Sequence, residues 1–310
     1  MTQPIQRVAI IGTGVIGASW TALFLAKGLD VVATDVAPGA EMKLRSFVDA
    51  SWPHLETLGL APDAARNRLQ FEPDLELAVR GVDLVQENGP ERIEFKQELY
   101  RKLDQLLPPT TIIASSSSGL TMSAIQQGCE SHPERCLIAH PFNPPHLIPL
   151  VELVGGAATS ENTIQRAATF YGGLGKRTIH LKKEVPGHVA NRLAAALFRE
   201  VVYLVAEDVV SVGDVDAAIC WGPGLRWGIM GPTLLYHLGG GPGGIDHWWD
   251  QFTGPMTALW NVLGDPVVTP EVRAKITAGV MEESAGRSIE ALEEIRDEKL
   301  LGLLAVRSGG

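Results

Sequence analysis

The sequence predicts an α/β fold in which a doubly wound parallel sheet with a helical insert precedes an all-helical C-terminal domain. Three observations predict this fold. Short β-rich runs alternate with amphipathic helical patterns through the first half of the chain. The first of these runs leads directly into three closely spaced glycines. After residue 186 the β-rich runs end and helical patterns continue almost to the C-terminus.

The expected strands are short runs rich in β-branched and other apolar residues. In chain order they cover Val8–Ile11, Val31–Thr34, Leu84–Gln86, Thr111–Ala114 and Leu137–Ala139. A charged insert, rich in Ala and Leu, lies between Val36 and Phe71 and is interrupted by Gly59 and Pro62. Its pattern predicts two helices joined by a turn beside the sheet, rather than a further strand.

The C-terminal part of the chain is expected to be helical. Helical patterns cover Val189–Glu207, Val215–Cys220, Pro270–Glu283 and Ser288–Val306. A glycine-rich loop over residues 239–244 interrupts them. A charged stretch that ends at Pro186 and Gly187, which break helices, marks the start of this part. We therefore expect two domains, residues 1–185 with the sheet and residues 186–310 with the helices.

Composition and charge narrow the classes of function. The chain has 310 residues, 45% of them hydrophobic, which is enough to bury one large core or two moderate ones. Its 26 basic and 36 acidic residues give a net charge of -10 without a basic run, so nucleic-acid and anionic-membrane partners are not expected. No signal sequence or membrane span is apparent. The three cysteines lack metal-ligand spacing, so we expect no metal site and a cytoplasmic protein.

The first predicted strand runs into a Gly-x-Gly-x-x-Gly turn. Gly12, Gly14 and Gly17 are its glycines, Val15 and Ile16 lie between the last two, and a helical pattern follows. Gly12 permits a tight turn, Gly14 lets the backbone approach a pyrophosphate, and Gly17 lets the helix pack on the strand. The helix N-terminus then faces the anionic phosphates. In this context the motif predicts the dinucleotide site of a Rossmann-type domain.

An acidic residue at the end of the second strand indicates which dinucleotide is bound. Asp35 lies 23 residues after Gly12, where its carboxylate can accept hydrogen bonds from both hydroxyls of an adenosine ribose. The same carboxylate repels a 2′-phosphate, and no Arg follows to bind one. These features favour NAD over NADP. The alternative is that Asp35 only caps the next helix.

A histidine and a glutamate on two successive apolar segments suggest acid–base chemistry. A strand leads to His140, which begins a proline-rich loop, and a second apolar strand carries Glu152. Oxidation of an alcohol needs a base for the hydroxyl proton. An imidazole titrates near neutral pH, and a carboxylate can fix its tautomer and stabilise its cation. Without further support, a lone loop histidine and an unrelated acid remain the alternative.

The order of several motifs resembles the 3-hydroxyacyl-CoA dehydrogenase superfamily over nearly the whole chain. In order, these motifs are the glycine turn 12–17, residues 86–91, Ser115–Leu120, His140 with Asn143 and Pro144, Glu152, and residues 186–192. The resemblance implies an NAD-dependent dehydrogenase that acts on a small L-3-hydroxy acid and forms a homodimer through its helical domain.

The resemblance also implies roles for single residues. His140 is the general base, Glu152 orients it, and Ser118 and Asn191 surround the substrate oxygen. Glu91, Lys96, Ser118 and Asn143 match positions that contact the nicotinamide half of NAD. Each role has a physical basis, since Lys96 can pair with ribose or phosphate oxygens, Asn143 can hold the carboxamide and Asn191 can donate to an alkoxide. Alternatively, Lys96 is a solvated helix residue and Ser118 caps a helix.

Within this family, the segment around Arg226 and Trp227 is similar to the branches that act on free acids, the carnitine and gulonate 3-dehydrogenases. An arginine can clamp a substrate carboxylate with two parallel hydrogen bonds. The carnitine branch is the better match, and aromatic side chains can bind its trimethylammonium group. The candidate aromatic residues are Trp221, Trp227, Tyr236, Trp248 and Trp249. Gulonate, a short acyl-CoA and a non-catalytic NAD-binding relative remain the alternatives.

Overall fold

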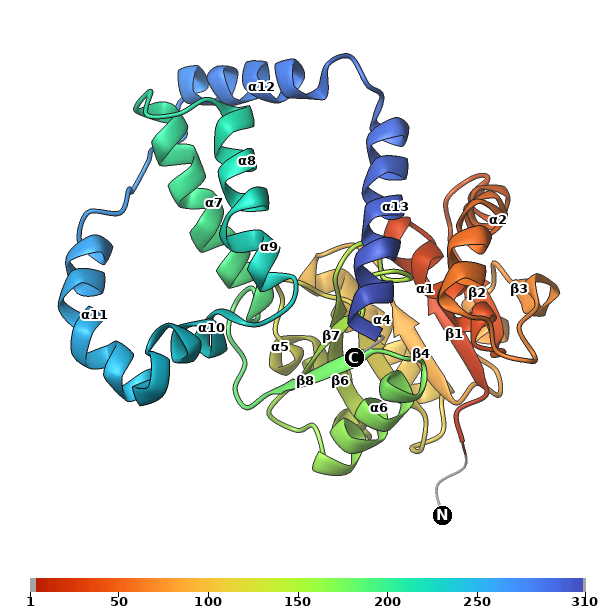
Figure 1. The fold of residues 1–310 in the computed structure, drawn as a ribbon. Coiled ribbons are helices and arrows are strands. Elements are labelled where there is room, and N and C mark those ends of the chain that lie inside the picture. Colours follow the sequence, from red (N-terminus) through yellow and green to blue (C-terminus); the bar gives the residue numbers. More distant parts are fainter. Residues whose placement is uncertain (1–3, 309–310) are drawn as a thin grey trace. The chain divides into compact units, whose positions relative to one another are not determined.

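The computed structural model describes residues 4–308. The chain divides into two compact units, one that ends at Asn191 and one that begins at Arg192. All eight strands of the described residues lie in the first unit (Figure 1).

One eight-stranded sheet forms the centre of the first unit, in the order β3-β2-β1-β4-β5-β6-β7-β8. The strands are β1 (Arg7–Ile11), β2 (Asp30–Thr34), β3 (Leu69–Phe71), β4 (Leu84–Glu87), β5 (Ile112–Ser115), β6 (Cys136–Pro141), β7 (Leu150–Gly155) and β8 (Arg177–Leu181). Neighbours from β3 to β6 are parallel, β7 is antiparallel to β6, and β8 is parallel to β7. The predicted doubly wound sheet is confirmed, and the chain direction reverses between β6 and β7.

Helices cover both faces of the sheet. Successive strand residues point to opposite faces, so strands that are apolar throughout need cover on both sides. The helices of this unit are α1 (Val15–Ala26), α2 (Ala40–Leu58), α3 (Leu75–Ala78), α4 (Ile93–Leu106), α5 (Met122–Ile125) and α6 (Glu161–Gly173), with short 3-10 turns at Arg66–Arg68, Gln126–Gly128 and Pro133–Arg135. On one face, Val8 and Ile10 pack with α1, α2 and α6. On the other, Ala9 and Ile11 pack with α4 and α5.

The prediction for the insert was wrong in its second half. The first predicted helix is present as α2, but a 3-10 turn and strand β3 replace the second helix. The strand pairs with β2 through Val31 opposite Leu69 and Ala33 opposite Phe71. Only three residues long, β3 is too short to show an alternating pattern, and its pairing with an exposed sheet edge decides its structure.

The second unit is helical, and no strand occurs among its described residues 192–308. Its helices are α7 (Ala190–Ala206), α8 (Val212–Trp221), α9 (Pro223–Trp227), α10 (Pro232–Gly239), α11 (Gly244–Trp260), α12 (Pro270–Ser284) and α13 (Ile289–Ser308), with a 3-10 turn at Gly241–Gly243. The four helices expected here are present, whereas α9, α10 and α11 were not expected. Within residues 4–308, no helix is both long and apolar enough to cross a bilayer.

Candidate active site

The glycine turn after β1 has the geometry that its spacing predicts. Gly12 has a φ of +84°, and a Cβ there would lie 2.8 Å from the carbonyl oxygen of Asn88. A Cβ at Gly17 would lie 1.9 Å from the carbonyl oxygen of Gly12, so the first turn of α1 packs directly on the glycine turn. At Gly14 nothing lies within 4 Å of an added Cβ, which leaves room for a ligand to approach the backbone.

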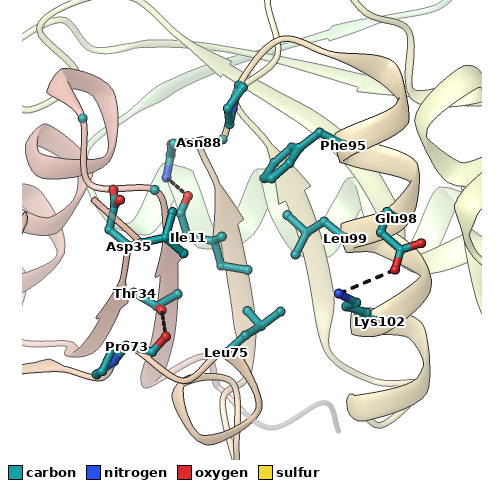
Figure 2. A pocket seen from close by; sticks show the side chains of 15 residues that line it. Ile11, Thr34, Asp35, Pro73, Leu75, Asn88, Phe95, Glu98, Leu99 and Lys102 are labelled. Atoms are coloured by element: carbon teal, nitrogen blue, oxygen red, sulfur yellow. Dashed lines mark hydrogen bonds and ion pairs between the residues drawn. The ribbon is translucent and has the colours of Figure 1, made fainter. Parts of the chain in front are cut away.

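A pocket of about 650 Å³ opens beside this turn (Figure 2). Gly12, Gly14 and Asp35 line it, together with apolar side chains that the sequence analysis did not single out. These additional residues include Val36, Pro73, Leu75, Phe95 and Leu99. The pocket lies at the carboxyl ends of β1, β2 and β4, where the strand order reverses and where such sheets bind ligands. Because Phe95 and Leu99 share one face of α4, their helical spacing was a signal for this wall.

Asp35 ties the ends of β1 and β2 together. Its Oδ2 accepts hydrogen bonds from the backbone N–H of Thr13 at 2.6 Å and from the Thr13 hydroxyl at 2.9 Å, and its Oδ1 accepts one from the Ala37 N–H at 2.9 Å. Burial alone would raise the pKa of Asp35, but these hydrogen bonds outweigh it and lower the pKa. The carboxylate therefore stays ionised at the pocket wall. It does not cap α2, because Gly39 precedes that helix.

Glu91 organises the loop that carries Ser118. One of its carboxylate oxygens, Oε1, accepts hydrogen bonds from the Ser117 hydroxyl at 2.6 Å and from the backbone N–H groups of Ser118, Gly119 and Leu120 at 3.1, 2.7 and 3.1 Å. Burial opposes ionisation, yet these hydrogen bonds and the nearby ammonium of Lys96 lower the pKa of Glu91. The Ser118 side chain is exposed and caps no helix, since Thr121 caps α5.

Lys96 is buried, with a side chain that is 1% exposed. Its Nζ lies 2.8 Å from both carboxylate oxygens of Glu87 and 3.8 Å from Oε2 of Glu91. Glu87 also accepts a hydrogen bond of 2.6 Å from the Ser115 hydroxyl. The alternative of a solvated helix residue is therefore wrong. Through the carboxylates of Glu87 and Glu91, the ammonium holds the loops after β4 and β5 together, a role that no pattern in the sequence indicated.

His140 and Glu152 form a buried pair. They lie directly opposite each other on the antiparallel strands β6 and β7, so their side chains share one face. His140 Nδ1 lies 2.8 Å from Glu152 Oε2. The other carboxylate oxygen, Oε1, accepts hydrogen bonds from the N–H groups of Val189 and Ala190 at 2.9 and 3.0 Å. A carboxylate can only accept, so His140 donates this hydrogen bond from Nδ1–H, which leaves the lone pair of the neutral ring on Nε2.

The environment of His140 keeps it neutral near neutral pH. Burial is the largest influence on its pKa and lowers it, and the neighbouring His188 lowers it further. The hydrogen bond that His140 donates to Glu152 and the charges of Glu152 and Glu91 oppose this effect without cancelling it. The pKa of His140 therefore lies below the ordinary value of 6.5. A neutral imidazole is the form that accepts a proton.

The loop after His140 is fixed at both ends. The Ser19 hydroxyl of α1 accepts a hydrogen bond of 2.8 Å from the His146 N–H. Lys176 donates from Nζ to the carbonyl oxygens of Pro145 and Ile148, the latter at 2.8 Å, and lies 5.3 Å from the centre of the Trp20 ring. These contacts leave Asn143 exposed on a rigid loop.

The remaining predicted residues have different surroundings. Asn191 is half-buried near the start of α7. Arg226 and Trp227 are exposed at the end of α9 in the second unit, and within residues 4–308 the Arg226 guanidinium forms no hydrogen bond or ion pair. The predicted aromatic set is divided. Tyr236 and Trp248 stack at 4.5 Å, and Trp249 and Phe252 lie 4.9 and 5.6 Å from Trp248, whereas the exposed Trp221 and Trp227 are outside this cluster.

The sequence matches two family models that follow one another along the chain. The NAD binding domain of 3-hydroxyacyl-CoA dehydrogenase matches residues 7–185, and the C-terminal domain of the same family matches residues 187–283. An L-carnitine dehydrogenase of Pseudomonas putida is 47% identical over 305 residues, which cover 98% of this chain and 95% of the relative. An L-carnitine dehydrogenase of Streptomyces griseus is 45% identical, covering 97% and 90%.

Solved structures show the same architecture. A 5-formyl-3-hydroxy-2-methylpyridine 4-carboxylic acid 5-dehydrogenase, described as an NAD+-dependent dismutase, has a TM-score of 0.85 at 33% identity and covers 98% of this chain and 99% of its own. A (S)-3-hydroxybutyryl-CoA dehydrogenase of Ralstonia eutropha has a TM-score of 0.65 at 26% identity and covers 89% and 94%.

Proposed function

Because the chain belongs to the 3-hydroxyacyl-CoA dehydrogenase family and is therefore an NAD-dependent dehydrogenase, we propose that it oxidises the C3 hydroxyl of L-carnitine to the ketone of 3-dehydrocarnitine. The substrate rests on the near full-length similarity to L-carnitine dehydrogenases. The reaction rests on the buried His140–Glu152 pair at the carboxyl end of β6.

The pocket beside the glycine turn fits NAD. The open space at Gly14 and the N-terminus of α1, which lacks a side-chain cap, would hold the pyrophosphate. Asp35 would accept hydrogen bonds from the adenosine ribose, and the apolar walls from Leu75 and Phe95 suit an adenine ring. When bound, NAD accepts the hydride that leaves C3 of the substrate.

The residues of this chain would accept the hydroxyl proton and stabilise the charge that results. In oxidation, the C3–H bond breaks and its electron pair leaves with the hydride, while His140 Nε2 takes the proton of the hydroxyl. The substrate becomes a ketone, and His140 becomes an imidazolium that the Glu152 carboxylate stabilises at 2.8 Å. Ser118 and Asn191 would donate hydrogen bonds to the substrate oxygen as charge develops on it.

The nicotinamide end of NAD would meet the loops after β4, β5 and β6. Asn143 is exposed and held by a fixed loop, so it would bind the carboxamide. Glu91 would act from the loop that it organises. Because Glu87 already engages the ammonium of Lys96, we assign Lys96 the part of holding Glu91 and the Ser115–Leu120 loop in place.

Arg226 and Trp227 are the candidate substrate-binding pair of the second unit. Carnitine carries a carboxylate, which suits a guanidinium that no other described group occupies. Its quaternary ammonium suits an exposed aromatic face such as that of Trp227. We also propose that the protein is a homodimer and that it lies in the cytoplasm. Its three free cysteines support the reducing location.

The test is a panel of substrates whose oxidation is measured by the absorbance of the NADH that forms. Purified protein with NAD is assayed with L-carnitine, L-gulonate and 3-hydroxybutyryl-CoA, and L-carnitine is expected to give the highest kcat/KM. In the Arg226→Met variant, KM for L-carnitine is expected to rise roughly tenfold or more, because a two-point carboxylate contact is lost. Arg226→Lys should recover only part of the loss.

Two outcomes would contradict the proposal. Preference for the thioester or for gulonate would assign the chain to another branch of the family. Equal loss of activity in Arg226→Met with carnitine and with a carnitine ester, which lacks the carboxylate charge, would show that Arg226 does not bind the carboxylate. Arg273, also exposed in the second unit, provides the matched control variant Arg273→Met.

A further inference from the structure

A second histidine lies against the catalytic pair. His188 follows Pro186 and Gly187 and is 3% exposed. Its φ is +51°, a left-handed backbone that is uncommon for a residue with a side chain. A hydrogen bond of 3.0 Å from its N–H to the carbonyl oxygen of Val185 closes this turn. The turn therefore directs a large polar side chain into the interior of the first unit.

The ring of His188 contacts two parts of the proposed site. Its centre lies 5.0 Å from the centre of the His140 ring. Its Nε2 lies 3.0 Å from the carbonyl oxygen of Ser117, the residue before Ser118. Because a carbonyl oxygen only accepts hydrogen bonds, Nε2 is the protonated nitrogen. The opposite nitrogen, Nδ1, is buried without a hydrogen-bond partner among the described residues, which suits a lone pair better than an N–H.

The backbone that follows His188 contacts the Glu152 carboxylate, a third part of the proposed site. The N–H groups of Val189 and Ala190 donate to Oε1 of Glu152, whose other oxygen binds His140. His188 and the two residues after it thus join the Ser117–Ser118 peptide, the His140 ring and the Glu152 carboxylate. A displacement of His188 would move the base, its orienting carboxylate and the substrate-binding loop relative to one another.

We propose that His188 is a positioning residue that, through its Nε2–H bond to the Ser117 carbonyl, fixes the Ser118 loop against the His140–Glu152 pair. This inference rests on the proposed role of His140 as the base. It assigns His188 no proton transfer and no contact with substrate. The hydrogen bond is the essential part, and the ring volume is secondary.

Two replacements separate the hydrogen bond from space filling. His188→Phe keeps an aromatic ring but has no donor, whereas His188→Gln loses the ring but keeps an N–H at a similar reach. Both pay the cost of the same left-handed backbone. The kcat of His188→Phe is expected to fall roughly tenfold or more, since small misplacements of reacting groups carry such costs, and His188→Gln should retain clearly more. The factor by which kcat falls should exceed any factor by which KM for substrate rises, because the misplaced groups act mainly on the proton and on the charge that develops in the transition state.

The order of the two variants decides the question. If His188 only fills space, Phe is the better replacement and its kcat will equal or exceed that of Gln, which would overturn the proposal. Two measurements verify that each variant is folded: NAD binding, measured by tryptophan fluorescence, and thermal unfolding. If His188→Phe does not fold, His188→Leu takes its place. His140→Ala is measured in parallel, since full activity there would refute the proposed function, whereas an inactive His140→Ala with an unaffected His188→Phe refutes only the role of His188.

Discussion

At the scale of single residues, the proposed chemistry depends on how one carboxylate divides its two oxygens. Glu152 gives Oε2 to His140 and Oε1 to two backbone N–H groups, so both oxygens must accept. This double use fixes the carboxylate as well as the imidazole. It also means that Glu152 cannot be replaced by an amide without placing a donor against another donor.

The first residue-scale prediction concerns this pair. His140→Ala should lower kcat by a factor on the order of a hundred or more with NAD affinity nearly unchanged, because only a proton acceptor is removed. Glu152→Gln should lose about as much. If its oxygen stays on Val189 and Ala190, its NH₂ faces His140 Nδ1 and moves the ring proton to Nε2, where no further proton can be accepted. Steady-state kinetics and NAD titrations measure both; a mild Glu152→Gln would contradict the geometry.

The pH dependence of oxidation follows from the lowered pKa of His140. Because burial holds this pKa below 6.5, the neutral base persists as the pH falls to that value. The acid limb of kcat/KM for oxidation should therefore lie below pH 6.5, and the rate should fall as His140 protonates. A pH profile of kcat/KM checks this. An acid limb well above 6.5 would mean that another group controls the reaction.

The third residue-scale prediction concerns cofactor choice. Asp35→Ala combined with Val36→Arg should raise the preference for NADP over NAD by roughly tenfold or more, because the carboxylate no longer repels a 2′-phosphate and a guanidinium can bind it. Ratios of kcat/KM for the two cofactors measure the change. Val36→Arg alone is the control, since Asp35 would remain there to repel the phosphate. An unchanged ratio in the double variant would remove Asp35 from the ribose site.

At the scale of elements, strand register and loop anchors bring the site residues together. The antiparallel pairing of β6 and β7 places Glu152 opposite His140, and the carboxyl ends of β1, β2, β4 and β5 supply the other loops. Buried side chains then hold these loops: Lys96 between the loops after β4 and β5, and Lys176 under the loop after β6.

Lys176 gives the element-scale prediction. Burial lowers its pKa to about 7, so between that value and its ordinary value of 10.5 the folded chain binds fewer protons than the unfolded chain. Stability contributed by Lys176 should therefore rise as the pH increases through this window. Denaturant unfolding of wild type and Lys176→Met from about pH 6 to 10 should show a difference that grows in favour of wild type. Exposed Lys43→Met is the control, and a pH-independent difference for Lys176→Met would contradict the prediction.

How far the sequence predicts these elements depends on how local each signal is. The strands β1, β2, β4, β5 and β6 were recognisable because each is a buried apolar run next to turn residues. The strand β8 was not, since its edge position leaves Arg177 and His180 exposed and its sequence mixed. The Glu87–Lys96 pair and His188 were missed for a different reason. Their significance lies in partners distant along the chain, which no periodicity reveals.

At the scale of the whole molecule, the two units differ in how they bury apolar side chains. The first unit has two extended cores on the two faces of its sheet. In the second unit the cluster of buried side chains is small and consists of Val205, Val212 and Val215. Large apolar side chains are instead exposed on several of its helices, among them Trp221, Leu234, Leu259 and Trp260. Exposed apolar surface of this extent is typical of an interface.

The last prediction is that the second unit forms a homodimer. Light scattering after size exclusion should give about twice the chain mass of 33.3 kDa. Burying these apolar side chains between two copies removes them from water and so stabilises the dimer. Leu259→Glu combined with Trp260→Glu, on α11, should shift the protein toward the monomer, since charges are costly at the centre of an interface. NAD binding should be retained in that variant, because the residues lining the pocket belong to the first unit. Met42→Glu, an exposed apolar residue of α2 in the first unit, is the matched control and should leave the mass unchanged. A wild-type monomer at micromolar concentration would refute the dimer, and a dimeric double variant would place its interface away from α11.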